Sequence, residues 1–236
     1  VQLSFAPGDV GEIQEGENIN IIRDAVVFYR PNKHWNISFG QTKLPGNRQR
    51  VNSSGGLQLT DRSINNARFT IDRDFGFQVH NMNEFQDKFS YNFKTAVSTG
   101  EGRNITGNAD AGVAVTGKVE LLPFGAFSRD GTYFEGDIVR EKKPKLMLSG
   151  AFQQNNHAKR TQGQLGNDLF DERTMKSVML DVMLKYNGWA AMSSYMSRTT
   201  SRNAVTINPD DISQSNFAYV GNGFDDQLSY NFPSNY

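Results

Sequence analysis

The stretch 177–186, "SVMLDVMLKY", alternates regularly between two kinds of side chain. One set of alternate positions is apolar or aromatic: Val178, Leu180, Val182, Leu184 and Tyr186. The opposite set includes polar and charged residues: Ser177, Asp181 and Lys185. Because successive side chains of a β-strand point to opposite faces, this period of two predicts a strand with one apolar and one polar face.

The same alternation recurs along the chain, whereas helical periodicity is weak throughout. It predicts about nine strands of roughly 7–12 residues, which is long for a soluble sheet and close to the length that crosses a bilayer when tilted. The predicted strands are 24–30, 35–43, 68–79, 88–97, 112–122, 145–153, 177–186, 188–198 and 222–232. The expected fold class is therefore all-β and antiparallel.

Composition excludes several classes of function. The 236 residues carry 25 Lys and Arg against 25 Asp and Glu, and this neutrality argues against a nucleic-acid binder. The chain has no cysteine, which excludes disulfides, cysteine-ligated metals and thiol catalysis. Its three histidines are scattered without metal-ligand spacing, and no Ser-His-Asp set or catalytic carboxylate pair can be argued. We therefore predict no metal, no cofactor and no enzymatic activity.

Hydropathy favours a particular kind of membrane protein. The mean hydropathy is −0.58, and there is no run of about 18 apolar residues, so a transmembrane helix is excluded. A transmembrane β-barrel remains compatible with these values, because its outward apolar residues alternate with inward polar ones.

The expected connections alternate between short and long. The short ones are 31–34, 80–87, 187–188 and 233–235, and the long ones are 44–67, 98–111, 154–176 and 199–221. Outer-membrane barrels have short periplasmic turns and longer outer loops. A membrane strand at 133–141 would invert every later connection. We therefore interpret 123–144 as one periplasmic excursion that contains a short strand extension.

Aromatic residues lie next to the predicted short turns. They are Tyr29, Trp35, Tyr186, Trp189 and Phe232. Aromatic residues favour strands in general, but their clustering at one set of turns is typical of a girdle at the membrane interface. This pattern predicts a cell outer-membrane location, with membrane lipid as a partner.

The stretch 41–69, "QTKLPGNRQRVNSSGGLQLTDRSINNARF", concentrates positive charge. It has five cations and one acid, Asp61, so its net charge is +4; the cations are Lys43, Arg48, Arg50, Arg62 and Arg68. Three more lysines lie on the polar faces of predicted strands: Lys94, Lys118 and Lys185. Fixed cations in a narrow pore offset the dehydration of a passing anion. The alternative is a solvated outer loop that meets anionic lipopolysaccharide, and the sequence leaves open whether the loop folds inward or outward.

One residue near this stretch has a different expected role. Arg73 lies between Asp72 and Asp74 and shares its parity with apolar neighbours. We expect it to form a structural ion pair rather than to line a path for anions.

The segment 24–79, which opens "DAVVFYRPNKHWNISFGQTKLPGNRQRV", resembles the phosphate-selective porin O/P family of Gram-negative outer membranes. Further similar stretches are "GEGRN" (100–104), "LLPFG" (121–125), "KPKLMLSGAF" (143–152) and "VGNGFDDQLSYNFPSNY" (220–236). The resemblance covers most of the chain in order, and the first segment is the most specific part.

This resemblance implies a sixteen-stranded outer-membrane barrel, usually trimeric, with a loop folded into its lumen. It also implies arginines and lysines along an anion path, and passive diffusion of small hydrophilic solutes with a phosphate-like preference. On this basis residues 41–69 are the expected lumen constriction. Because bacterial barrels have even strand counts, we interpret residues 1–236 as one β-barrel domain that is incomplete at both ends.

Two other functions stay open at this point, because a fold does not fix a function. The first is a porin-like barrel that serves as a subunit of a multi-protein outer-membrane assembly. The second is a soluble β-sandwich or carbohydrate-binding module, against which the apolar strand faces count.

Overall fold

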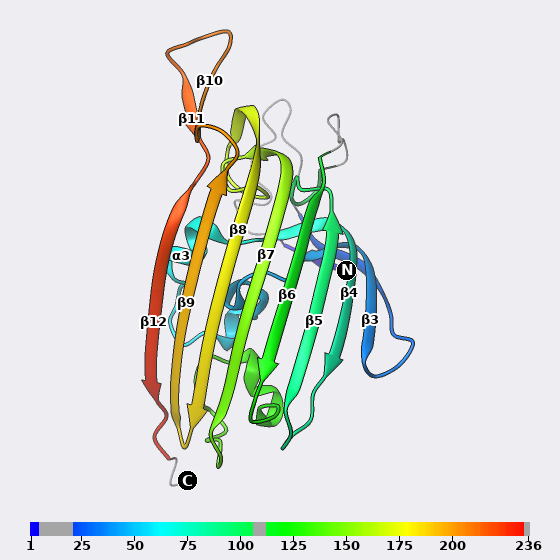
Figure 1. Cartoon of the computed structure of the whole chain (residues 1–236), viewed down its shortest axis with the longest axis vertical. Coiled ribbons are helices and arrows are strands. Elements are labelled where there is room, and N and C mark those ends of the chain that lie inside the picture. The colour runs from blue at the N-terminus through cyan, green and yellow to red at the C-terminus, as the bar shows by residue number, and fades with distance from the viewer. Residues whose placement is uncertain (5–20, 106–111, 234–236) are drawn as a thin grey trace.

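The computed structural model describes residues 1–4, 21–105 and 112–233. Within these residues, one ten-stranded sheet runs through the molecule in the order β1-β2-β3-β4-β5-β6-β7-β8-β9-β12 (Figure 1). All its neighbouring strands are antiparallel, and β1 and β12 are its two edges. The strands are β1 (Gln2–Leu3), β2 (Ile22–Tyr29), β3 (Trp35–Lys43), β4 (Arg73–Asn83), β5 (Ser90–Ser98), β6 (Ala114–Leu122), β7 (Lys145–Arg160), β8 (Asp168–Tyr186), β9 (Trp189–Thr200) and β12 (Gly221–Tyr230).

The all-β antiparallel prediction is confirmed, and each of the nine predicted strands overlaps one of β2–β9 and β12. The prediction is wrong at 68–72, because α3 (Ile64–Phe69) is a helix and β4 begins only at Arg73. The hydroxyl of Ser63 accepts the amide N–H of Asn66, which caps the helix before any strand can start.

Two predicted long connections are also shorter or more ordered than expected. Strands β7 and β8 extend past the predicted limits, so 161–167 alone joins them, instead of 154–176. The connection 201–220 contains a hairpin of β10 (Val205–Ile207) and β11 (Ser215–Phe217) that projects beyond the sheet (Figure 1).

The strand extension expected at 133–141 is absent from this described segment. A 3₁₀ element, η2 (Ser128–Tyr133), and turns occupy this part of 123–144 instead. Within 133–141, Arg140 has a φ value of 51°, which lies in the left-handed region and interrupts an extended chain.

The alternation of connections is visible in the structure. The turns β2–β3, β4–β5 and β8–β9 lie at one end of the sheet together with 123–144, and the connections β3–β4, β7–β8 and β9–β12 leave from the opposite ends of their strands (Figure 1). Asn187 and Gly188 join β8 to β9 with φ values of 48° and 92°. Positive φ at both central residues is the type I′ geometry that Asn-Gly favours in hairpins.

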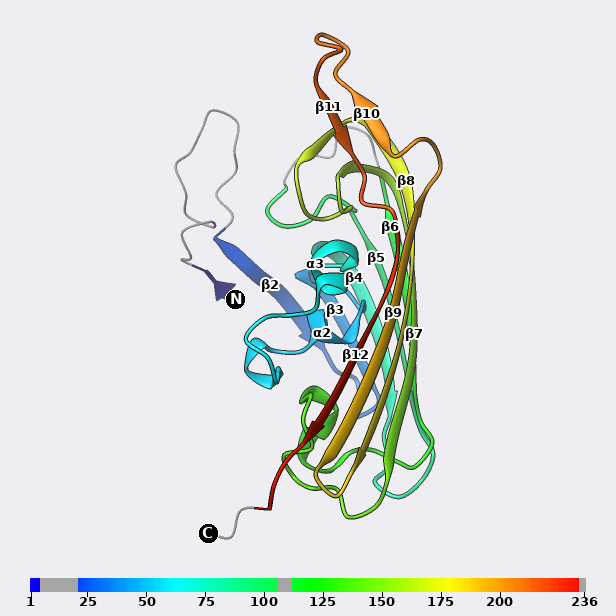
Figure 2. The same cartoon turned by 90° about the vertical axis from the view of Figure 1, so that its left-hand side faces the viewer.

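The two faces of the curved sheet differ in chemistry. In β8, Val178, Leu180, Val182 and Leu184 are exposed, whereas the side chains between them are buried. The short helices α2 (Arg48–Val51) and α3 and the 3₁₀ turn η1 (Ser54–Gly56) lie on the concave side, which carries the polar positions (Figure 2). This is the reverse of a soluble sheet, whose apolar face is the covered one. Among the described residues, no helix has the length and apolar character needed to span a membrane.

A small apolar core fills the middle of the concave side. It consists of buried residues from β5, β7, β8, β9 and the connection after β3: Leu44, Ile71, Ala96, Ala151, Met179 and Met196. Leu44 and Ile71 stand at the two ends of the connection between β3 and β4, so this core holds that connection against the sheet.

Gly40 sits where β2, β3 and β4 approach closely. It pairs with Val26 on one side and Gly76 on the other, has φ of +128°, and an added Cβ would lie 2.2 Å from the Ala25 carbonyl oxygen. We expect Gly40→Ala to lower the free energy of unfolding by about 1–3 kcal/mol, because the backbone is strained for any other residue. Urea unfolding followed by tryptophan fluorescence measures this, and Gly117→Ala is the matched control, since its Cβ would meet nothing within 4 Å. Equal unfolding midpoints for the two variants would contradict the expectation.

Candidate functional site

The connection between β3 and β4, residues 44–72, is called the inward loop, because it packs on the concave side of the sheet (Figure 2). It contains most of the basic stretch predicted at 41–69. Lys118 on β6 donates from Nζ to the Gly46 carbonyl oxygen at 3.0 Å. The direction in which the loop folds, which the sequence leaves open, is thus inward.

Arg198 on β9 is a second anchor of the inward loop, and it is 2 % exposed. Its guanidinium donates to the carbonyl oxygens of Arg68, Phe69 and Thr70 at 3.3, 3.0 and 2.9 Å. Its Nε donates to the Ser177 hydroxyl at 3.0 Å. A cation at the carboxyl end of α3 satisfies carbonyls that have no partner inside the helix.

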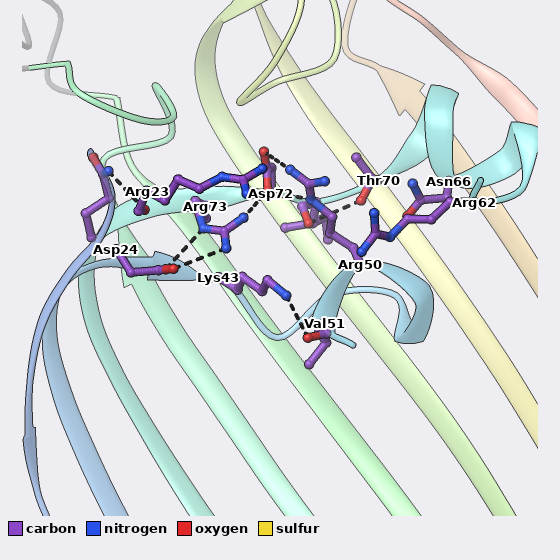
Figure 3. A network of polar contacts seen from close by, with 12 residues as sticks. Arg23, Asp24, Lys43, Arg50, Val51, Arg62, Asn66, Thr70, Asp72 and Arg73 are labelled. Atoms are coloured by element: carbon purple, nitrogen blue, oxygen red, sulfur yellow. Dashed lines mark hydrogen bonds and ion pairs between the residues drawn. The ribbon is translucent and has the colours of Figure 1, made fainter. Parts of the chain in front are cut away.

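A group of paired charges lies on the inward loop and the adjoining strands β2 and β4 (Figure 3). Arg50 donates from Nε to Asp72 Oδ1 at 2.6 Å, and its Nη2 contacts the other carboxylate oxygen. Arg73 donates to both carboxylate oxygens of Asp24 at 3.1 Å and lies 3.8 Å from Asp72. These two-point contacts fix both guanidinium groups in the geometry that arginine favours with carboxylates.

Arg73 is therefore paired, as expected, but with Asp24 and Asp72 rather than with both of its neighbours in sequence. Asp74 turns instead to β5 and the following turn, where it accepts the amides of Gly100 and Gly102. Both carboxylates are buried, since Asp72 and Asp74 are at most 1 % exposed.

Lys43 and Arg62 complete this group without an ion pair among the described residues. Lys43 donates to the carbonyls of Val51 and Asn52 at 2.9 and 3.2 Å. Arg62 donates to the carbonyls of Gln49 and Asn52 at 2.8 and 3.3 Å. Carbonyl oxygens orient a cation but leave its charge uncompensated.

We call Lys43, Arg50, Arg62 and Arg73 the cation cluster. Its four positive charges face two carboxylates, Asp24 and Asp72, which leaves a net charge of +2. Burial lowers the pKa of Arg62, and the neighbouring Arg50 lowers it further. Arginine nevertheless stays protonated in proteins, so Arg62 keeps its charge.

Arg48, also predicted for the anion path, points to a different part of the molecule. It is buried and donates to the carbonyls of Thr132 and Phe134, the latter at 2.8 Å. Burial lowers the pKa of Arg48, which the nearby Asp181 and Glu135 oppose. Arg48 thus ties the inward loop to 123–144.

Glu135 strengthens the same junction. Its amide donates to the Gly56 carbonyl at 2.9 Å, and its carboxylate accepts the Gln58 amide at 2.8 Å and the Gln49 side chain at 3.3 Å. The inward loop and 123–144 therefore contact each other on the concave side, although they are far apart in the sequence.

The three lysines predicted along the barrel wall all lie on the concave face and are buried. Lys94 and Lys118 share one acid, Glu120, at 2.7 and 3.1 Å. Lys185 donates to the carbonyls of Gly131, Phe134 and Gly136 at 2.7, 2.7 and 2.8 Å. The ion pairs with Glu120 join β5 to β6, and the Lys185 contacts hold 123–144 in place. A role of these lysines along an anion path remains a prediction.

Arg68 is separate from the cation cluster. Its guanidinium lies 5.0 Å from the centre of the Tyr219 ring, and the side chain is exposed. The position of Arg68 thus relates it to the connection 201–220 rather than to Asp72 and Arg73.

The aromatic residues predicted for an interfacial girdle are all exposed and lie at or next to strand ends beside the short turns: Tyr29, Trp35, Tyr186, Trp189 and Phe232. Tyr230 joins them, with ring centres 4.8 Å from Trp189 and 5.0 Å from Phe232. This placement suits a girdle, and contact with lipid stays a prediction.

Sequence reasoning missed Arg198 and Asp24 as parts of the site. Arg198 occupies the last position of a predicted strand, on the buried parity with Met196, and that parity was its only signal. Asp24 is distant in sequence from Arg73, and only the register of β2, β3 and β4 brings them together.

Comparison with known proteins gives one family. The model for the family described as phosphate-selective porin O and P matches residues 2–224. Neither the search of curated proteins nor the search of solved structures gives a match. The matched region includes β1 to β9, the start of β12, the inward loop and the segment 123–144. An antiparallel sheet with an apolar convex face and a charged concave face accords with that match, and the chain belongs to the phosphate-selective porin O and P family.

Proposed function

We propose that this protein is an outer-membrane porin through which small hydrophilic solutes diffuse passively, with a preference for phosphate-like anions. The family match supports a porin. The observation that carries the anion preference is the cation cluster, whose net charge of +2 lies on the inward loop and the adjoining ends of β2, β3 and β4.

The physical basis of the preference is electrostatic. An anion that enters a narrow passage loses part of its hydration shell, and fixed cations offset that cost. Lys43 and Arg62 suit this function best, because they contact carbonyls rather than carboxylates. Arg50 and Arg73 would hold the cluster together, since their carboxylate partners fix their positions.

The orientation in the membrane follows from the same proposal. The apolar convex face would contact lipid, and the exposed aromatic residues would lie at its periplasmic interface. The turn end with 123–144 would then be periplasmic, and the β10–β11 hairpin would face outward. The family resemblance also suggests a homo-trimer, which cross-linking in native outer membranes tests directly.

Neutralising Arg62 should weaken the anion preference. Arg62→Gln removes one charge of the cluster, and a charge at roughly 6 Å from the ion in water is worth about 0.7 kcal/mol, or about threefold in permeability ratio. Reversal potentials in planar bilayers with a KCl gradient measure this ratio. The ratio should fall for Arg62→Gln and rise for Asp24→Asn, because the second change raises the cluster from +2 to +3.

Changes of opposite sign distinguish an electrostatic effect from general damage to the pore. Arg202→Gln, at an exposed arginine beyond the end of β9, is the control and should leave the ratio unchanged. An unchanged ratio in both cluster variants would place the path for ions away from the cluster. No conductance from a folded protein that co-purifies with stable partners would instead favour a subunit of an outer-membrane assembly.

A further inference from the structure

An apolar pocket lies between the end of α3 and the connection that precedes β12. Its volume is about 510 Å³, and it is lined mainly by aromatic and aliphatic side chains: Arg68, Phe69, Ala204, Val205, Phe217, Ala218, Tyr219 and Val220. Pockets of this size and character commonly hold small molecules. No carboxylate is among the lining residues.

The walls of this pocket are held by backbone hydrogen bonds and by packing against a buried cluster. The amides of Ala218 and Tyr219 donate to the carbonyls of Ala204 and Thr161 at 2.9 and 2.7 Å. Ala218 is buried against Ala158 and Met175, so the pocket floor belongs to a packed cluster. A site whose backbone is already fixed loses little freedom when a ligand binds.

Arg68 supplies the single charge of the pocket. Its backbone carbonyl is held by Arg198, and its guanidinium lies 5.0 Å from the Tyr219 ring centre. Among the described residues, no carboxylate lies within ion-pair distance of it. The Phe217 and Tyr219 rings lie beside each other, with centres 5.3 Å apart. The pocket therefore combines an apolar body with one uncompensated cation at its side.

We propose that this pocket binds small organic anions with an apolar body, of the class of arylalkyl carboxylates. The carboxylate would pair with Arg68, and the ring or alkyl chain would pack against Phe217, Tyr219 and Val205. The positive charge of Arg68 favours an anion, and the pocket volume of about 510 Å³ limits the ligand to a small molecule. This goes beyond passage of inorganic anions, because phosphate gains nothing from an apolar wall.

The test uses the protein in lipid nanodiscs, because free detergent would compete for an apolar pocket. The probe is 4-phenylbutyrate, compared with neutral 4-phenylbutanol and with inorganic phosphate, and binding is followed by ligand-observed NMR titration. We expect saturable binding of 4-phenylbutyrate that is at least about fivefold tighter than that of the alcohol, because only the acid pairs with Arg68. Inorganic phosphate should not displace the probe.

Two variants separate the parts of the pocket. Arg68→Gln should weaken binding of the acid to the level of the alcohol, whereas Phe217→Ala should weaken both ligands, because it removes apolar wall. Both side chains are exposed, so neither change should disturb folding. Arg202→Gln, an exposed arginine outside the pocket, should bind the acid as the wild type does.

Several results would overturn the proposal. They are no saturable binding to the wild type, equal binding of acid and alcohol, or retention of a phosphorylated lipid that excludes the probe, as detected by mass spectrometry of the purified protein. Arg62→Gln should lower the bilayer permeability ratio without changing probe binding. The failure of the pocket and the failure of the anion preference are therefore distinguishable.

Discussion

Replacing Arg198 with methionine should release the inward loop from β9 and raise the single-channel conductance of the pore. Three carbonyl oxygens of Arg68, Phe69 and Thr70 lose their donor. Each buried acceptor left without a partner costs on the order of 1 kcal/mol, so the free energy of unfolding should fall by about 3 kcal/mol. Methionine keeps much of the side-chain length and has no charge to bury, which limits other effects. Planar-bilayer recordings and urea unfolding measure the two outcomes.

The control for this change lies in the same part of the chain. Arg202→Met removes an exposed arginine whose contact is a 3.7 Å ion pair with an exposed carboxylate, and such pairs contribute little. It should leave both conductance and unfolding unchanged. If Arg198→Met loses stability but keeps the wild-type conductance, the inward loop does not limit the passage of ions.

Replacing Lys185 with methionine should loosen 123–144 at the opposite end of the sheet. The Nζ of Lys185 is the shared donor for Gly131, Phe134 and Gly136, so its loss leaves three carbonyls without that partner. The expected cost is about 1–2 kcal/mol, because the Phe134 carbonyl keeps Arg48 and the Gly131 carbonyl keeps the Phe134 amide as donors. Because Arg129 is exposed within this segment, limited trypsin digestion should cleave there faster in the variant. Mass spectrometry of the fragments locates the cut.

Lys176→Met is the matched control for Lys185, because the same strand carries Lys176 on its exposed convex side. Its digestion rate at Arg129 should equal that of the wild type. Equal cleavage in Lys185→Met would show that other contacts, such as those of Asp137 with the amides of Glu141 and Gly188, suffice to hold the segment.

The period of two in the sequence was enough to predict nearly all of the sheet. Alternation reports directly on which side of a strand each residue faces, and β8 follows the pattern along its full apolar face. The prediction failed where local chemistry overrides period. Ser63 caps a helix that runs into the predicted strand 68–79, and left-handed Arg140 breaks the extension expected at 133–141.

The sequence was sufficient to predict most of the charged residues that make up the site, but not which partners each of them contacts. The basic stretch identifies which residues could carry charge, and Arg50 and Arg62 do lie together. Their partners depend on strand register and on contacts between distant segments. Arg48, for example, finds its acceptors 84 and 86 residues away, and no local pattern encodes that choice.

The junction that Arg48 and Glu135 form between the inward loop and 123–144 has an evolutionary consequence. A length change in the inward loop would displace Gly56 and Gln58 from Glu135, so substitutions and insertions in the two segments should be accepted only in compatible pairs. The β10–β11 hairpin pairs chiefly with itself and projects from the sheet. Related sequences should therefore diversify at the hairpin, which the proposed orientation places on the outer side of the membrane, while the junction changes by coordinated replacement.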